Sequence, residues 1–416
     1  MDPSGAAAKT IAEMKRLDSV FRVMTEKEFE LINKLMWPRS VVKEDMLRWH
    51  RQGFVWSEYI NRKFGLIQNV GGPCGVLAAV QAYLLRFLLF GSKSMDSKKQ
   101  WTRIQDDISA EERECALASA MSDIVSQCRA RETSKFVLVR LANSNEILTP
   151  ESKANRIVLA EFDDIDSYRL ALRRNMASFF SKSGVLLFVY SVVLSRGIEF
   201  VRSDTDEPGM CALTAKHGHC TQELLNLLLL GVARSQVFDG TRPVGETGLV
   251  LRGVEKRPQV GLLSYLEAMR YLEVGSLFKN PLMPIYVISS SSHFTVLFCL
   301  ERDLVAQSTE ERVYKSIRRA FATFDSHDNG FINVSDLDKL LDATSKLGAN
   351  SEDSQDEDPV TSFVSALSAQ VKKKSETRTH TTYSHLSFSL SLSSQQQHHL
   401  NLIMFSHSES KIKICG

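Results

Sequence analysis

The sequence predicts a mixed α/β (α+β) fold. A long apolar run begins at Cys74 and has the spacing of a buried helix. Two segments, Phe136 to Leu141 and Arg156 to Phe162, are rich in strand-forming residues and flank a loop that contains Pro, Asn and Ser. Near residue 290, Ile285–Ile288 and His293–Phe298 are separated by serines, as in a hairpin of two strands.

The elements follow from local signals, taken in chain order. Residues 1–20 are small and polar, and we expect them to fray. Thr25 to Glu28 forms a capping box for a helix that reaches Met36 and is followed by Pro38. Trp49 and the run Phe54-Val55-Trp56 resemble a short strand that leads into the segment around Cys74.

Further helices are expected from apolar periodicity and capping. Thr221 is a suitable N-cap for a core helix that starts at Gln222. The run from Val185 to Leu194 fits a strand or a buried helix equally well. The segments that we expect to be helical are Cys74 to Phe90, 109–129, Ile165 to Phe180, Gln222 to Leu230 and Val260 to Tyr271.

Composition excludes several classes of protein. The chain has 416 residues and a net charge of +2, so its composition does not indicate a broad basic surface for nucleic acid or membrane. Its seven cysteines are scattered and odd in number, which argues against a disulfide framework and fits a reducing compartment. The N-terminus has no apolar signal segment, and the longest apolar runs are too short to span a bilayer.

Cys74 stands in the most informative segment of the chain. It follows Gly71, Gly72 and Pro73 at the head of the predicted helix, where free backbone N–H groups and the helix dipole favour a thiolate. The glycines permit the close approach of another chain. The side-chain amide of Gln68 could donate to an oxyanion beside the sulfur. The alternative is that this segment has no catalytic role. Gly-Pro is common in turns, and a free cysteine is often a small, unreactive buried residue.

His293 is the candidate base for this thiol. It heads a predicted strand after a polar turn, a position that is rigid yet open to substrate. A Cys–His pair needs only closeness in space, so a separation of 219 positions is no objection. Taken alone, His293 would be a half-exposed strand histidine. The residue that orients its imidazole cannot be chosen from Ser291, Ser292 and Thr295.

A second group of residues has metal-ligand types. Cys211, His217, His219 and Cys220 lie close together, but their spacing matches no common zinc pattern. We therefore favour a loop that leads into the Leu-rich helix.

Together these segments resemble the MINDY family of cysteine deubiquitinases, in its EF-hand-containing branch. The matching blocks occur in the same order and are Gln68 to Gln81, Gln222 to Ala233, Leu262 to Pro281 and Ser292 to Val296. The resemblance implies a papain-like fold and hydrolysis of isopeptide bonds in polyubiquitin, with lysine-48-linked chains as the known family substrate. It implies Cys74 as nucleophile, His293 as general base and Gln68 as oxyanion donor, with Gly71 and Gly72 along the path of the ubiquitin tail.

The implied organisation has four parts. Residues 1–47 are an N-terminal helical extension, 48–305 the papain-like catalytic domain, 306–348 an EF-hand-like insert, and 349–416 an acidic linker with a low-complexity tail expected to be disordered. Catalysis would need no cofactor, the partners would be ubiquitin and polyubiquitin chains, and the expected location is cytoplasm and nucleus. Because family members continue their folded domain beyond the insert, the tail suggests an altered or truncated C-terminus that could leave the enzyme inactive.

The EF-hand-like loop runs from Asp325 to Asp336. The ligand positions fall on Asp325, Asn329, Phe331 (through its carbonyl), Asn333 and Asp336. His327 replaces an oxygen donor, and Asp336 is shorter than the usual bidentate Glu. We expect calcium to bind weakly or not at all, and the loop to serve as a spacer. Two other functions stay open: a non-catalytic ubiquitin-binding or EF-hand scaffold, and a peptidase for another ubiquitin-like modifier.

Overall fold

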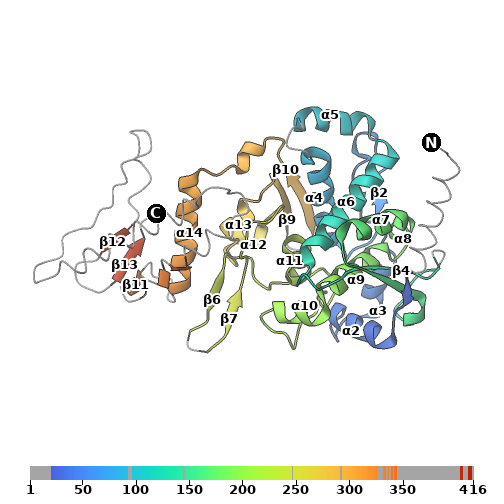
Figure 1. The fold of residues 1–416 in the computed structure, drawn as a ribbon, viewed down its shortest axis with the longest axis horizontal. Coiled ribbons are helices and arrows are strands. Elements are labelled where there is room, and N and C mark those ends of the chain that lie inside the picture. The colour runs from blue at the N-terminus through green and yellow to red at the C-terminus, as the bar shows by residue number, and fades with distance from the viewer. Residues whose placement is uncertain are drawn as a thin grey trace, which may run out of the picture. The chain divides into compact units, whose positions relative to one another are not determined.

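The computed structural model describes residues 20–91, 96–143, 146–245, 247–290, 293–325 and 331–333, five residues between 336 and 343, and the strands at 403–405 and 411–414. The chain divides into two compact units (Figure 1). The first comprises Met1–Phe238 and Arg257–Val305, and the second comprises Asp239–Lys256 and Ala306–Gly416.

Long buried helices form the core of the first unit. Helix α4 (Cys74–Phe90) packs against α6 (Ala110–Cys128) and α11 (Gln222–Leu230), and α6 also packs against α9 (Gly184–Arg196). The hydroxyl of Thr221 caps α11 as predicted, and the hydroxyl of Ser109 caps α6. The run at Val185 is thus a buried helix, an outcome that periodicity alone left open.

One antiparallel sheet lies beside α9. Its order is β1 (Arg22–Val23), β5 (Ile157–Phe162) and β4 (Phe136–Leu141), and the last two are the strands predicted there. Ser191 and Ser195 on α9 accept hydrogen bonds from the backbone N–H groups of Val139 and Val137, so the helix satisfies one edge of the sheet. The capping box of α2 (Glu26–Met36) is present as predicted.

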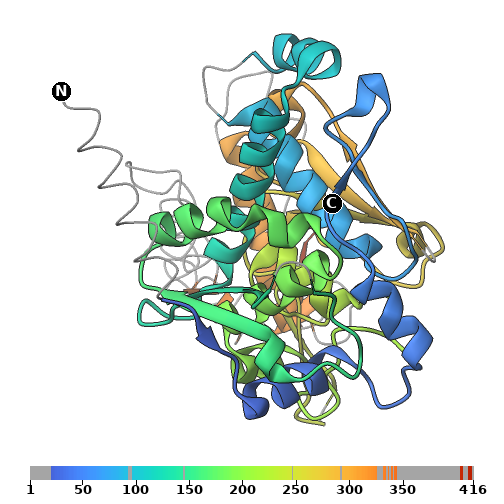
Figure 2. The same cartoon turned by 90° about the vertical axis from the view of Figure 1, so that its right-hand side faces the viewer.

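A second sheet carries the predicted hairpin. Strands β9 (Ile285–Ser289) and β10 (Phe294–Phe298) are antiparallel, and β8 (Gly261–Ser264) joins β9 in parallel. Figure 2 shows α4, in light blue, beside the yellow and orange strands of this sheet.

Two helix predictions need correction. The segment Val260 to Tyr271 is β8 followed by the single helical turn α12 (Tyr265–Ala268), because a parallel strand buried between neighbours is continuously apolar and resembles a buried helix. The segment Ile165 to Phe180 is two helices, α7 (Ile165–Arg174) and α8 (Met176–Phe180), which are separated at Asn175.

The shorter elements complete this unit. Strand β2 (Val55–Trp56) confirms the predicted lead-in strand, but Trp49 belongs to helix α3 (Lys43–His50). The remaining elements are η1 (Ile60–Arg62), β3 (Leu66–Ile67), α5 (Ser97–Asp107), η2 (Ala154–Arg156), α10 (Ile198–Asp204), α13 (Ser276–Lys279) and η3 (Arg302–Val305).

The second unit contains a hairpin, a helix and a small sheet. Strands β6 (Thr241–Pro243) and β7 (Val250–Arg252) pair, and α14 (Thr309–Phe324) contacts β6. Strand β11 (Phe331–Asn333) pairs with β13 (Lys411–Ile414), which also pairs with β12 (Ile403–Phe405). These two C-terminal strands differ from the predicted disorder: β12 is wholly apolar, and β13 alternates lysine with isoleucine. The acidic linker and the other tail residues, on which the idea of a truncated C-terminus rests, lie outside the described residues.

Among the described residues, no single helix is long and apolar enough to span a membrane. Helices α9 and α10 meet the length and composition requirement only together, as a pair bent by 83°. Helix α9 is almost wholly buried within the first unit.

Candidate active site

Cys74 is the first residue of α4, and its side chain is only 4% exposed. Pro73 occupies the N-cap, so the backbone N–H groups of the first turn have no partner within the helix. The thiol lies 3.9 Å from the carbonyl oxygen of Gly72. The cysteine is therefore placed as the sequence predicts, at a helix start with free N–H groups, but it is more enclosed than an open nucleophile.

The turn before α4 requires glycine at one position. Gly72 has a φ of +119°, and a Cβ there would lie 3.0 Å from Nε1 of Trp49 and 3.2 Å from the carbonyl oxygen of Gly218. Trp49 Nε1 donates a 2.7 Å hydrogen bond to that same carbonyl. Gly71 is exposed, and a Cβ there would meet only Nη1 of Arg48, at 3.2 Å. The narrow turn is thus held between α3 and the loop around Gly218.

The hairpin β9–β10 brings the region of His293 to Cys74. Strand β10 packs against α4, and the ring of Phe294, the residue after His293, would lie 3.4 Å from a Cβ on Gly75, the residue after Cys74. The N–H of His293 donates to Oγ of Ser290 at 3.1 Å, and its carbonyl accepts from the N–H of Ser290 at 2.9 Å. The side chain of His293 is exposed. Ser291 and Ser292 lie outside the described residues, and within the described part no side chain hydrogen-bonds to the imidazole.

The electrostatic environment of the thiol differs from the prediction. Burial raises the pKa of Cys74, while the backbone N–H groups of Phe294, Gly75 and Cys74 lower it by a smaller amount. The N–H groups at the helix start therefore lower the pKa of the thiol as expected, but desolvation of the thiol raises this pKa by more. A thiolate here needs a base or a nearby positive charge in addition to the helix.

Gln68 lies close to Cys74 in sequence, but its amide has another partner. Nε2 donates a 2.7 Å hydrogen bond to the carbonyl of Val70. To donate to an oxyanion, the side chain would have to rotate away from Val70. The neighbouring backbone is fixed by Gln52, whose Oε1 accepts from the N–H of Asn69 at 2.9 Å and whose Nε2 donates to the carbonyl of Ile67 at 3.2 Å.

Gln52 and Gln81 are positioning residues that the sequence analysis missed. Gln52 is completely buried. Gln81 Oε1, on α4, accepts from the N–H of Leu66 at 2.7 Å, so the helix that begins at Cys74 is joined directly to β3. The available signal for Gln81 was a polar amide within an otherwise apolar run, since an amide that is partly removed from water needs partners. Gln52 lies in no such run.

The loop that contains Cys211, His217, His219 and Cys220 packs on the same region. Arg48 Nη2 donates to the carbonyl of His217 at 2.8 Å, and a Cβ on Gly75 would lie 2.7 Å from Sγ of Cys220. No group of three or more His, Cys, Asp or Glu residues within the described ranges could hold a metal ion. The loop acts as a cover for the helix start.

The calcium-loop residues are described only in part. Asp325 ends α14, and its N–H donates to the carbonyl of Phe321 at 3.1 Å. Asp336 accepts from Nζ of Lys339 at 2.9 Å. Phe331 and Asn333 belong to β11, whereas His327 and Asn329 lie outside the described residues.

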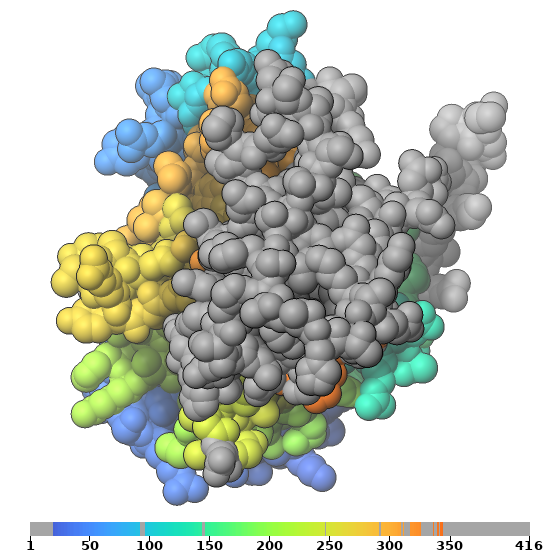
Figure 3. Space-filling view, turned by 90° about the vertical axis from the view of Figure 1, so that its left-hand side faces the viewer, coloured from blue at the N-terminus to red at the C-terminus, as the bar shows by residue number. Residues whose placement is uncertain are grey.

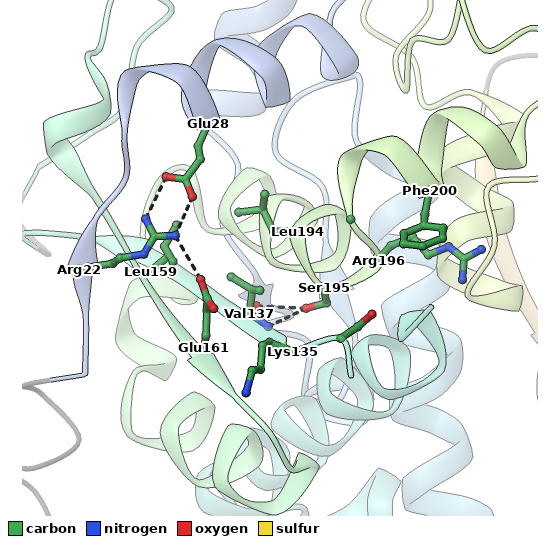
Figure 4. Close-up of a pocket in the computed structure, with 12 residues that line it drawn as sticks. Arg22, Glu28, Lys135, Val137, Leu159, Glu161, Leu194, Ser195, Arg196 and Phe200 are labelled. Atoms are coloured by element: carbon green, nitrogen blue, oxygen red, sulfur yellow. Dashed lines mark hydrogen bonds and ion pairs between the residues drawn. The ribbon is translucent and has the colours of Figure 1, made fainter. Parts of the chain in front are cut away.

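A pocket of about 260 Å³ lies elsewhere in the first unit and contains no predicted site residue. Arg22 spans its mouth and binds Glu28 and Glu161, while Ser195 bonds to the backbone of Val137 (Figure 4). Its charged side chains are all in ion pairs: Arg22 pairs with Glu28 and Glu161, while Lys135 and Arg196 pair with Asp163 and Asp204 outside the pocket.

Comparisons with known proteins converge on one family. Residues 39–317 match the family model described as "Deubiquitinating enzyme MINDY-3/4, conserved domain". The chain is similar to "Ubiquitin carboxyl-terminal hydrolase MINDY-3" of Xenopus tropicalis, at 35% identity over 353 residues that cover 77% of this chain and 76% of the relative. The protein of the same name from Homo sapiens is 34% identical over 323 residues, which cover 71% and 69%.

A third relative covers less of its own length. "Probable ubiquitin carboxyl-terminal hydrolase MINDY-4" of Mus musculus is 35% identical over 278 residues, which are 64% of this chain and 36% of that protein. No solved structure matches the chain.

Proposed function

Because the chain belongs to the MINDY-3/4 family of deubiquitinating enzymes and is a ubiquitinyl hydrolase, we propose that it cleaves polyubiquitin with Cys74 as nucleophile and His293 as general base. The observation that carries this proposal is the packing of β10, which directly follows His293, against α4, which begins at Cys74. It joins the helix start and the histidine hairpin, which lie more than 200 positions apart in the chain.

The reaction follows from the roles of these groups. His293 removes the proton from Cys74, and the thiolate attacks the carbonyl carbon at the C-terminus of ubiquitin. The imidazolium then gives its proton to the leaving lysine amine as the C–N bond breaks. Water attacks the resulting thioester, with His293 again as base, and releases ubiquitin and free Cys74.

The negative charge on the tetrahedral oxygen needs donors beside the sulfur. The backbone N–H groups of Cys74 and Gly75 at the start of α4 are close enough to lower the thiol pKa, so they are suitable donors. Gln68 would add its amide after leaving Val70. Gly71 and Gly72 leave room for a thin substrate tail, since side chains there would meet Arg48 and Trp49.

The finer assignments rest on the resemblance to the wider MINDY family. We propose a papain-like arrangement, because a helix that carries the nucleophile packs against a sheet that carries the base. We also propose lysine-48-linked chains as substrates, action in cytoplasm and nucleus, and no cofactor for catalysis.

Cleavage of purified diubiquitins of defined linkage tests the proposal. We expect wild type to cut the lysine-48-linked dimer and Cys74→Ala to be inactive. We expect His293→Ala to lose about 10²–10⁴-fold in rate, as for removal of a general base. Gln68→Ala should lose about 10²-fold if its amide serves the oxyanion.

Leu170→Ala is the matched control, because Leu170 is an exposed apolar residue on α7. Full activity of His293→Ala would contradict the assigned base. Equal cleavage of every linkage would contradict the proposed chain preference but leave the nucleophile in place.

A further inference from the structure

The sheet register places α12 at the same edge as His293. Ser264, the last residue of β8, lies opposite Ser289 of β9, and Ser289 lies opposite Phe294 of β10. Tyr265 follows the first member of this row, and His293 precedes the last. Because neighbouring strands are about 4.8 Å apart, the start of α12 is roughly 10 Å from His293 across the sheet.

Four large side chains on and just after α12 are exposed. Tyr265 is 53% exposed, Leu266 37%, Met269 48% and Tyr271 76%, and we call this set the α12 surface. In the space-filling view, the yellow segment that includes α12 forms part of the molecular surface (Figure 3). Exposed groups of aromatic and methionine side chains are typical of protein–protein contacts.

The backbone beneath the α12 surface is well ordered. Ser264 Oγ caps the turn at the N–H of Leu266, and the N–H of Tyr271 returns to the carbonyl of Leu266 at 2.9 Å. Arg270 adopts a φ of +62°, which costs energy in a residue with a Cβ. The apolar side chains are therefore presented in a fixed arrangement, which lowers the entropy cost of binding.

The rim of the α12 surface is polar. Glu267 Oε1 accepts from the N–H of Val274 at 2.9 Å and from Nζ of Lys279 at 2.6 Å. An apolar centre with an ion pair at its edge is the usual composition of a reversible protein interface.

We propose that the α12 surface docks the folded body of the ubiquitin whose C-terminus reaches Cys74. This inference rests on the proposed function. A substrate tail at Cys74 passes beside His293, so the globular part of that substrate has to lie on the adjoining surface. The α12 surface adjoins His293 at the same sheet edge and exposes the aromatic residues that make good anchors.

Steady-state kinetics on ubiquitin with a fluorogenic group at its C-terminus tests this docking. We expect Tyr265→Ala/Tyr271→Ala to lower kcat/KM at least tenfold, with the larger change in KM. The double variant should alkylate at Cys74 with iodoacetamide at the wild-type rate, because the thiol site itself is intact. Leu170→Ala should match wild type in both measurements.

Wild-type kcat/KM in the double variant would overturn the docking surface while leaving the proposed function standing. The docking surface would also be overturned if alkylation of Cys74 in the double variant slowed by the same factor as kcat/KM, since the tyrosines would then support the thiol site. If the wild type is a dimer and the double variant is a monomer, the surface serves self-association instead. If wild type fails to process the ubiquitin substrate, the proposed function itself fails.

Discussion

At the scale of single residues, Cys74 lies between two opposing influences. The N–H groups of its helix start and of Phe294 favour the thiolate, while burial favours the neutral thiol and dominates. Without a base or a positive charge nearby, the helix start would therefore leave most of the thiol protonated near neutral pH. The proposed mechanism therefore needs a base beside the thiol, and His293 is the residue to which we assign that role.

His50 gives a residue-scale prediction about stability and pH. Burial lowers the pKa of its imidazole to about 4, and neither ring nitrogen has a hydrogen-bond partner among the described residues. Between pH 6.5 and 4 the unfolded chain binds a proton that the folded chain does not bind. The His50 contribution to stability is therefore complete above the ordinary pKa and is lost as the pH falls toward 4.

We expect the wild type to lose about 1–2 kcal/mol more than His50→Phe in free energy of unfolding between pH 7 and pH 5. Urea unfolding at both pH values, followed by tryptophan fluorescence, measures this difference. Identical losses in the two proteins would show that His50 is solvated and titrates in the folded state.

At the scale of elements, the turn before α4 should be sensitive at one glycine and tolerant at the other. Gly72→Ala has to adopt a positive φ and places its Cβ against Trp49 and Gly218. We expect it to lower the free energy of unfolding by about 1–3 kcal/mol.

Gly71→Ala is the matched control. Its φ lies outside the left-handed region, and its Cβ would meet only the end of the Arg48 side chain, so we expect a loss below about 0.5 kcal/mol. Thermal melts of both variants provide the comparison. A larger loss in Gly71→Ala than in Gly72→Ala would contradict the described turn.

At the scale of the whole molecule, the EF-hand-like segment is expected to be a weak calcium site. Lys339 binds the Asp336 carboxylate at 2.9 Å, so a cation already interacts with the position where calcium usually takes a bidentate ligand. We expect a dissociation constant no tighter than about 10⁻³ M by isothermal titration calorimetry. Micromolar binding that disappears in Asp325→Ala would contradict this expectation.

Much of the fold could be predicted because local signals were unambiguous. The caps at Thr25 and Thr221 identified two helix starts. Alternation and strand propensity identified β4, β5, β9 and β10. β8 was missed because a four-residue parallel strand has no periodicity of its own, and its apolar run continues into α12.

The sequence names candidate site residues, whose catalytic roles stay predictions, but it does not give their contacts or their burial. Residue types and turn chemistry pointed to Cys74 and His293. The hydrogen bond from Gln68 to Val70 and the supporting roles of Gln52 and Gln81 depend on loop geometry that no short pattern encodes. The prediction that the surroundings of Cys74 favour its thiolate was wrong. Burial raises the pKa of the thiol, and burial depends on the assembled fold rather than on the helix start alone.

The central claim is that Cys74 is the nucleophile of this deubiquitinase. It is tested most directly with ubiquitin that carries an electrophile at its C-terminus, followed by intact-mass and peptide analysis of the full chain. We predict a single adduct on Cys74 in the wild type and none in Cys74→Ala. An adduct on another cysteine, or an undiminished adduct in Cys74→Ala, would contradict the claim.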